Sequence, residues 1–218
     1  MLFAIALFAF LLGSIPFGVL ICKAKGIDIF AVGSGNIGAT NVVRAVGPKL
    51  GGLVFALDVL KGLIPGVLAK VLIHDQPFGL HIQTLSFMAG CIAILGHMYS
   101  PWIGFKGGKG IATGLGAMLA AMPLTALGAM IVMVAVTWPS RYVSLGSIIA
   151  GLSTIPISML VVKDSPQVLP ILIVFNIFVI YKHRANIQRL LNGTENKFGF
   201  KKSENSDRGD KDDQERGE

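Results

Sequence analysis

The chain has 218 residues, of which 53% are apolar and only 14% are charged, whereas a typical soluble domain carries about 25% charged residues. Residues 1–181 contain ten Lys or Arg and four acids, so the excess of positive charge lies in the apolar part of the chain and not in its tail. This composition excludes a soluble nucleic-acid-binding protein, a secreted disulfide-stabilised domain and a disordered chain, and it indicates an integral membrane protein with basic loops.

Apolar stretches follow one another along the chain, each near the roughly 20 residues that an α-helix needs to cross a bilayer. The first is expected to be a retained membrane span, because no Lys or Arg precedes it and it is too long for a cleaved signal peptide. The stretches predict an all-α integral membrane protein and lie at about 2–22, 51–73, 82–100, 111–138, 143–162 and 166–181.

The charges of the connections predict the topology. Segments 23–50 and 101–110, Arg141 and the start of the tail are basic, which places them in the cytoplasm, whereas 74–81 has no Lys or Arg and is expected outside. With the N-terminus outside and the C-terminus cytoplasmic, residues 111–138 must begin and end on the cytoplasmic side. Because Pro123 interrupts this stretch, we expect a hairpin of two short helices and about seven transmembrane or membrane-embedded helices in all.

The domain organisation follows from the same pattern. Residues 1–200 are expected to form one polytopic membrane domain, and residues 201–218 are expected to be a disordered cytoplasmic tail, because they are highly charged and lack an apolar period. Cys22 and Cys91 lie in apolar runs without further ligands at metal-binding spacing, so no metal site is expected.

The first polar segment between the apolar stretches runs from Gly33 to Asn41 and is followed by Arg44. It contains the pattern G-x-G-x-x-G, but transmembrane flanks and the placement of Asp58 inside a span exclude a dinucleotide-binding fold. Its glycines allow several backbone N–H groups to converge on an anion, and Arg44 can bind a phosphate in a bidentate manner. The alternative is a glycine-rich turn without a ligand.

The second polar segment is Lys106-Gly107-Gly108-Lys109-Gly110, with Thr113 close behind. It is not a nucleotide-binding P-loop, because Gly110 stands where that motif needs Ser or Thr. It does combine flexible backbone and two ammonium groups with the start of an apolar helix, whose N-terminus attracts anions. The alternative is a pair of lysines that only anchor the loop in the cytoplasm.

The third polar segment is split between 140–144 and 183–189. His183 and Asn186 are three residues apart and share one helix face, although a histidine at this depth can also serve as a lipid headgroup anchor. Asp58 and Lys61, also three apart, are expected to pair within their span, with Lys61 able to reach a ligand.

Some catalytic arrangements are missing from the sequence. It has no carboxylate pair for a metal-bound nucleotide, and Trp102 stands five residues after His97 where a His-x-x-x-x-Asp dyad would need its acid. The surplus of cations over acids on one face predicts anionic ligands, and more than one of them.

Together these segments resemble the bacterial acyl-phosphate-dependent glycerol-3-phosphate acyltransferase family. The resemblance covers about residues 1–200 and rests on five motifs in order, which are SGNIGATNVVR at 34–44, DVLKG at 58–62, GHMYSPWIGFKGGKGIAT at 96–113, SRYVSLGS at 140–147 and HRANIQRLLNGTE at 183–195. It implies transfer of an acyl group from an acyl phosphate to the 1-hydroxyl of glycerol 3-phosphate, giving lysophosphatidate and inorganic phosphate, as the first acylation of phospholipid synthesis.

The resemblance also implies a site, a location and partners. Ser34, Arg44, His183 and Asn186 are the expected catalytic residues, and Glu195 is expected to be structural. The enzyme is expected to be a monomer in the bacterial plasma (inner) membrane, facing the cytoplasm, with two small-molecule substrates and without cofactor, metal or nucleic acid. The candidate substrate-binding residues, from the motifs and the residue chemistry together, are Asn36, Asn41, Lys61, Lys106, Gly107, Gly108, Lys109, Gly110, Thr113, Arg141 and Ser144.

The residues predict a direct transfer without an acyl-enzyme, because an acyl phosphate is already activated and Ser34 has no neighbouring histidine in the sequence. The proton of the hydroxyl can go to His183 or to the departing phosphate. An anion transporter is the alternative function, although all the polar segments fall at the predicted cytoplasmic edge.

Overall fold

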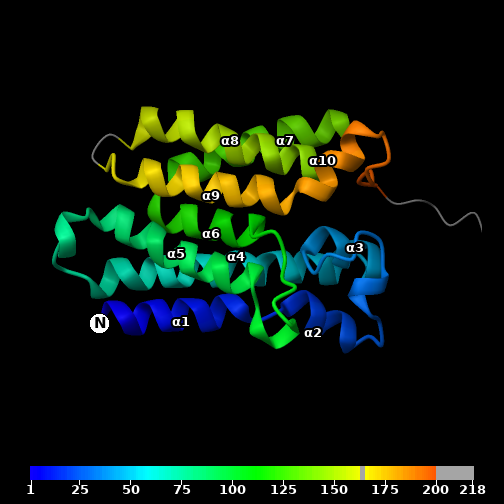
Figure 1. Ribbon diagram of the computed structural model, residues 1–218, viewed down its shortest axis with the longest axis horizontal. Coiled ribbons are helices and arrows are strands. Elements are labelled where there is room, and N and C mark those ends of the chain that lie inside the picture. Colours follow the sequence, from blue (N-terminus) through cyan, green and yellow to red (C-terminus); the bar gives the residue numbers. More distant parts are fainter. Residues whose placement is uncertain (163–164, 200–218) are drawn as a thin grey trace, which may run out of the picture.

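The computed structural model describes residues 1–162 and 165–199, and all the regular elements in these ranges are helices (Figure 1). The predicted tail at 201–218 lies outside the described residues. Three short 3₁₀ helices lie at Ile29–Ala31, Pro77–Gly79 and Pro101–Ile103. The α-helices are α1 (Leu2–Ser14), α2 (Phe17–Lys23), α3 (Ala39–Val46), α4 (Pro48–Leu72), α5 (Ile82–Met98), α6 (Ile111–Ala121), α7 (Pro123–Ser140), α8 (Val143–Val161), α9 (Val168–Lys182) and α10 (Arg184–Leu191).

The described helices are long and apolar enough to confirm an all-α integral membrane protein. Five segments qualify as membrane spans by length and composition, and α9 with α10 makes a sixth if this pair, bent by 57°, is taken as one. The apolar helix α6 is shorter, at 11 residues. The five spans are Leu2–Lys23, Pro48–Leu72, Ile82–Ile103, Pro123–Ser140 and Val143–Val161.

The first span is not the uninterrupted helix that the sequence predicted, because it breaks between α1 and α2 at Ile15 and Pro16. Proline has no N–H to continue the helix, so carbonyl groups before it need other partners. The Ser14 carbonyl accepts a hydrogen bond from Ser100 Oγ at 2.6 Å, and the Ile15 carbonyl accepts one from Lys61 Nζ at 3.1 Å.

The predicted hairpin at 111–138 is present. Helix α6 ends at Ala121, Met122 leaves the helical region with φ −141° and ψ 68°, and Pro123 begins α7. Gly110 before α6 and Val143 after α7 line the same cavity, so the two helices run in opposite directions and return to one end of the molecule (Figure 1).

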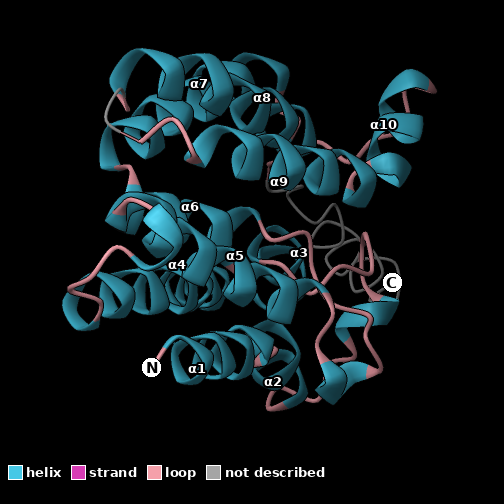
Figure 2. Cartoon of the chain, turned by 60° about the vertical axis from the view of Figure 1, so that its left-hand side comes forward, coloured by secondary structure: helices cyan, strands magenta, loops and turns pink. Residues whose placement is uncertain are grey.

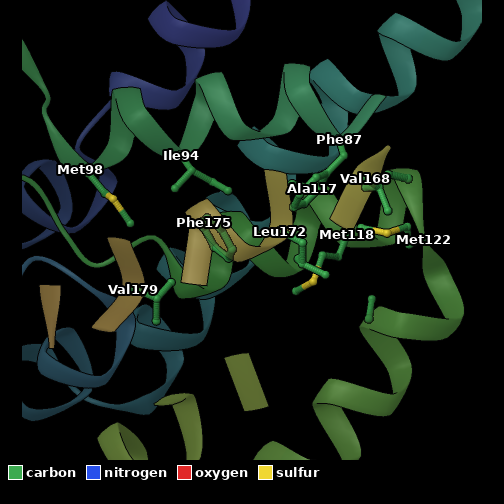
Figure 3. Packing of buried hydrophobic residues seen from close by; sticks show 12 residues of the cluster. Phe87, Ile94, Met98, Ala117, Met118, Met122, Val168, Leu172, Phe175 and Val179 are labelled. Carbon is green, nitrogen blue, oxygen red and sulfur yellow. The ribbon is translucent and has the colours of Figure 1, made fainter. Parts of the chain in front are cut away.

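The helices form two groups that meet along α5, α6 and α9. Helices α1 to α6 pack against one another around α4, and α7 packs along α8 in the second group (Figure 2). Phe87 of α5 and Phe175 of α9 meet edge to face with centroids 6.3 Å apart (Figure 3). Leu172, Val179 and Met118 extend this buried apolar cluster between the groups.

Small residues bring α4 and α6 into close contact. A Cβ on Gly116 would lie 1.9 Å from the carbonyl oxygen of Val59, and one on Gly62 would lie 2.0 Å from that of Thr113. Close backbone approach through glycine is typical of helix pairs in membranes. It fixes the start of α6 beside α4, where a polar cavity opens.

Candidate active site

A cavity of about 150 Å³ lies between the two helix groups at the end of the molecule where α3 and α10 are found. Its walls come from segments far apart in the sequence. The loop before α3 and α3 itself form one wall, the start of α6 with α4 and α5 forms the second, and α8, α10 and the segment after α10 form the third.

The first wall is a loop held in place by two asparagines. Asn41, which is buried, accepts a hydrogen bond from the Ser34 N–H at 3.0 Å and donates to the carbonyl groups of Ile29 and Val32 at 3.3 and 2.9 Å. Asn36 accepts from the Gly38 N–H at 2.8 Å. Both asparagines line the cavity, but these bonds use them to shape the loop.

Ser34 and Arg44 are two polar side chains of this wall that remain available. Both line the cavity, and no hydrogen bond joins the Ser34 hydroxyl or the Arg44 guanidinium to another described residue. Burial lowers the pKa of Arg44, the negative charge of Glu195 raises it in part, and Arg189 lowers it further. A guanidinium remains charged under these conditions and can bind a phosphate in a bidentate manner.

The second wall carries Lys109 at the end of a glycine-rich loop. The Gly108 N–H donates to the His97 carbonyl at 3.1 Å, and a Cβ on Gly108 would lie 2.1 Å from His97 Nε2. A Cβ on Gly107 would lie 2.0 Å from the same carbonyl oxygen. These glycines therefore allow the loop to pack on His97, and neither lines the cavity.

Gly110 and Lys109 complete that wall. Gly110 has φ 77°, a conformation that favours glycine, and it directs the chain into α6. Lys109 Nζ donates a hydrogen bond to Asn186 Oδ1 across the cavity. Burial lowers the pKa of Lys109 to about 8, with Glu195 opposing the shift and Arg189 and Arg44 adding to it.

The third wall is organised by Glu195. Its Oε1 accepts hydrogen bonds from Ser144 Oγ at 2.8 Å and from Asn186 Nδ2 at 2.6 Å, and its Oε2 accepts from Arg189 Nε at 2.7 Å. Burial alone would raise the pKa of Glu195, but these hydrogen bonds and the charge of Arg189 hold it below its ordinary value. Because Asn186 Nδ2 binds the carboxylate, its Oδ1 turns toward Lys109.

His183 lies at the junction of α9 and α10 and is almost fully buried. Its Nδ1 lies 2.8 Å from the carbonyl oxygen of Val179, which can only accept a hydrogen bond. Nδ1 therefore carries a proton, and in the neutral ring Nε2 is the acceptor. His183 lines the cavity, so this nitrogen is available to a ligand there.

Several predicted site residues do not line the cavity. Lys61 does not line it, and its ammonium pairs with Asp58 and donates to the Ile15 carbonyl; the Thr113 hydroxyl is buried within α6 without a hydrogen-bond partner among the described residues. Lys106 is exposed, and Arg141 is exposed and donates to the Phe198 carbonyl at 3.2 Å. With Gly107 and Gly108, these are the six predicted residues that the structure does not bring into the cavity wall.

Two buried ionisable groups of the cavity wall were not predicted as site residues. Asp58 and His97 both line it, and both are more than nine-tenths buried. The sequence signal was an acid and a histidine inside otherwise apolar spans, where a polar group needs a reason to be present. Among residues 1–162 and 165–199, no three His, Cys, Asp or Glu side chains are placed to hold a metal ion together.

Comparison with known proteins identifies a family model and relatives that match most of this chain. The family model for glycerol-3-phosphate acyltransferase matches residues 3–193. A glycerol-3-phosphate acyltransferase of Aquifex aeolicus is 47% identical over 194 residues, covering 89% of this chain and 97% of the relative. The enzyme of the same name from Geobacter sulfurreducens is 44% identical and covers 87% of this chain and 94% of the relative.

Two solved structures are similar to the whole helical body. They are crystal structures of PlsY (YgiH), described as an integral membrane glycerol 3-phosphate acyltransferase, in a glycerol 3-phosphate form and a lysophosphatidic acid form. Both are 44% identical in sequence and cover 91% of this chain. Their TM-scores are 0.83 and 0.81, and the match covers 96% and 95% of those chains.

Proposed function

Since the chain belongs to the glycerol-3-phosphate acyltransferase family, we propose that its acyl donor is a fatty acyl phosphate and that the acyl group passes directly to the sn-1 hydroxyl of glycerol 3-phosphate. The products are lysophosphatidate and inorganic phosphate. The bond between the carbonyl carbon and the phosphate oxygen of the donor breaks, and an ester bond forms between that carbon and the glycerol oxygen. The hydroxyl proton leaves with the phosphate or through a side chain.

One observation carries this proposal, namely that Arg44 and Lys109 line one small cavity from two different walls. Two cations so placed can bind two phosphate groups and offset the repulsion between them. When the donor is an acyl phosphate, phosphate is the leaving group, so the same cations stabilise the leaving group as well as the phosphate of the acceptor. The leaving group of a thioester donor is a thiol, which would not need the second cation.

Catalysis then consists mainly of positioning. The donor is a mixed anhydride and is already activated, so holding the hydroxyl against its carbonyl carbon can supply roughly 7–11 kcal/mol of the barrier reduction. Ser34, Arg44 and the N-terminus of α6 suit one phosphate, and Lys109 with Asn186 suits the other. The acyl chain extends between the helices toward the membrane, beside Phe55 and Met133 of the cavity wall.

Ser34 is proposed to bind substrate and not to become acylated. Its hydroxyl has no histidine partner in the described structure that could activate it as a nucleophile. The acceptor nitrogen of His183 or the departing phosphate takes the hydroxyl proton. A lasting acyl adduct on Ser34 after rapid quenching would contradict direct transfer.

We infer a location in the bacterial plasma (inner) membrane with the cavity facing the cytoplasm and the N-terminus outside. The basic connections around Lys25, Arg44, Lys109 and Arg184 all lie at the cavity end, whereas the opposite end carries the segment 74–81 without Lys or Arg (Figure 1). This distribution follows the positive-inside rule. This orientation also gives water-soluble glycerol 3-phosphate access to the cavity from the cytoplasm.

The test uses purified full-length protein with a fatty acyl phosphate and glycerol 3-phosphate. Phosphate and lysophosphatidate should form in equal amounts, and Lys109→Ala and Ser34→Ala should each reduce kcat/KM by about 100-fold or more while the protein stays folded. Lys70→Met, a loss of positive charge on α4 away from the cavity, is the matched control. Folded protein without product, together with phosphate flux in liposomes, would favour the transporter alternative.

A further inference from the structure

We propose that Asp58 binds the second hydroxyl group of glycerol 3-phosphate, the one that is not acylated, and thereby lets the site recognise a diol. Asp58 projects from α4 and lines the cavity, although its exposed fraction is only 3%. The inference relies on the proposed function only for which of the two hydroxyl groups reacts.

The surroundings of Asp58 leave it with acceptor capacity toward the cavity. Its Oδ1 pairs with Lys61 Nζ at 2.8 Å, and Lys61 does not line the cavity because its ammonium reaches back to the Ile15 carbonyl. The hydrogen bonds and ion pairs of the described residues give Oδ2 no partner. His97 Nδ1 lies 3.8 Å from Oδ1, beyond hydrogen-bond distance, and is itself buried without a partner.

The charges in the cavity separate two kinds of ligand group. Arg44 and Lys109 attract phosphate, whereas a phosphate placed at Asp58 would be repelled by the carboxylate. A hydroxyl group donates a hydrogen bond, so it is the natural partner of a carboxylate oxygen. A ligand with phosphate at one end and hydroxyl groups at the other matches this division.

Asp58 suits a hydroxyl that keeps its proton. If the carboxylate accepted a proton, Lys61 would become an unpaired cation inside the membrane-spanning part of the protein, which is strongly unfavourable. Binding without proton transfer preserves the ion pair. The partner is therefore the hydroxyl that does not react, while the reacting hydroxyl is left to His183, which lines the same cavity, or to the departing phosphate.

The experiment compares glycerol 3-phosphate with 3-hydroxypropyl phosphate, which lacks only the second hydroxyl. Binding of each to the full-length protein is measured calorimetrically without an acyl donor, and kcat/KM is measured with one. A site built to bind a hydroxyl rejects the analogue that lacks it, so the wild type should prefer glycerol 3-phosphate by about 100-fold or more. Equal binding of the two compounds to the wild type would overturn the proposal without any variant.

The variant Asp58→Leu/Lys61→Met removes both members of the ion pair, because replacing a whole pair by apolar residues is tolerated far better than removing one member. The double variant should bind glycerol 3-phosphate more weakly but 3-hydroxypropyl phosphate as well as before. The ratio of the two affinities should therefore fall to within about threefold of one. A merely structural role would weaken both compounds equally, and an unchanged preference would overturn the proposal. Lys70→Met on the same helix should retain the wild-type preference.

Asp58→Asn provides the second measurement if the double variant does not fold. Its amide oxygen accepts a hydrogen bond without the charge, so the preference should be intermediate, and a wild-type preference in this variant would count against Asp58. Because binding is measured without a donor, an enzyme that proves to use a donor other than acyl phosphate would still give a clear result for Asp58.

Discussion

Two carboxylates line the cavity, and they obtain their partners in different ways. Asp58 pairs with Lys61 three residues further along the same helix, so this ion pair forms with α4 itself. Glu195 binds Asn186 and Arg189 of α10 and also Ser144 of α8, which is 51 residues away, so its full set of contacts forms only when α8 packs beside α10. The first pair makes a charge tolerable inside a span, and the second arrangement positions the groups that face the ligand.

The largest expected effect comes from breaking the local pair. Lys61→Met should lower the free energy of unfolding by about 3–5 kcal/mol, because it leaves the Asp58 carboxylate buried without its cation. Denaturant unfolding of the detergent-solubilised protein measures this effect. Asp58→Leu/Lys61→Met should recover most of the lost stability, and a double variant as unstable as Lys61→Met would contradict the explanation.

Breaking the assembled arrangement should affect activity more than stability. Glu195→Gln removes the charge that holds Asn186 and Arg189, and hydrogen bonds to charged groups contribute about 1.5–3 kcal/mol, so kcat/KM should fall by about 10- to 100-fold. Steady-state kinetics measures the loss, and unfolding should change less than in Lys61→Met. Activity within about twofold of wild type would show that Asn186 keeps its orientation without the carboxylate.

The protonation of Lys109 provides a third test. If the ammonium form binds phosphate, kcat/KM for glycerol 3-phosphate should fall as the pH rises through about 8, the value to which burial lowers the pKa of Lys109. Because Glu195 opposes this lowering, the fall should occur at lower pH in Glu195→Gln. A pH–rate profile between pH 6 and 10 is measured for the wild type and for Glu195→Gln. If kcat/KM falls at the same pH in both proteins, the charge of Glu195 does not raise the pKa of Lys109 and the explanation is contradicted.

The smallest effect should come from the neighbouring lysine. Lys106 lies three residues before Lys109 but is exposed and outside the cavity wall, so Lys106→Ala should change kcat/KM by less than about twofold. Kinetics of Lys106→Ala beside Lys109→Ala makes the comparison directly. Equal losses in the two variants would mean that both lysines bind the ligand.

The sequence predicted the membrane-spanning segments well, because hydropathy acts on whole helices. The hairpin was predictable from Pro123 and from the charges at its two ends, whereas the break at Pro16 was not anticipated in an otherwise uniform apolar run. The short helix α3 within the first polar segment was also missed. Both are local features that hydropathy does not resolve.

The site was predictable as a set of segments but less so residue by residue. Lys61 was predicted as a possible ligand contact, but in the structure it does not line the cavity, whereas its partner Asp58 does. Gly107 and Gly108 were predicted as ligand contacts, and in the structure they pack closely on His97 and do not line the cavity. Spacing along a loop does not determine which side chain turns inward, because that depends on contacts with distant segments.

The hydrogen bond between Lys109 and Asn186 joins residues 77 positions apart and crosses the cavity between the two helix groups. A lysine ammonium has three N–H donors and this bond uses one of them, so an incoming anion can bind the other two while Asn186 stays in place. The amide thereby fixes the position of the long Lys109 side chain before a ligand arrives. A ligand that binds this ammonium therefore does not bear the entropic cost of ordering the side chain, and the bond preorganises the site.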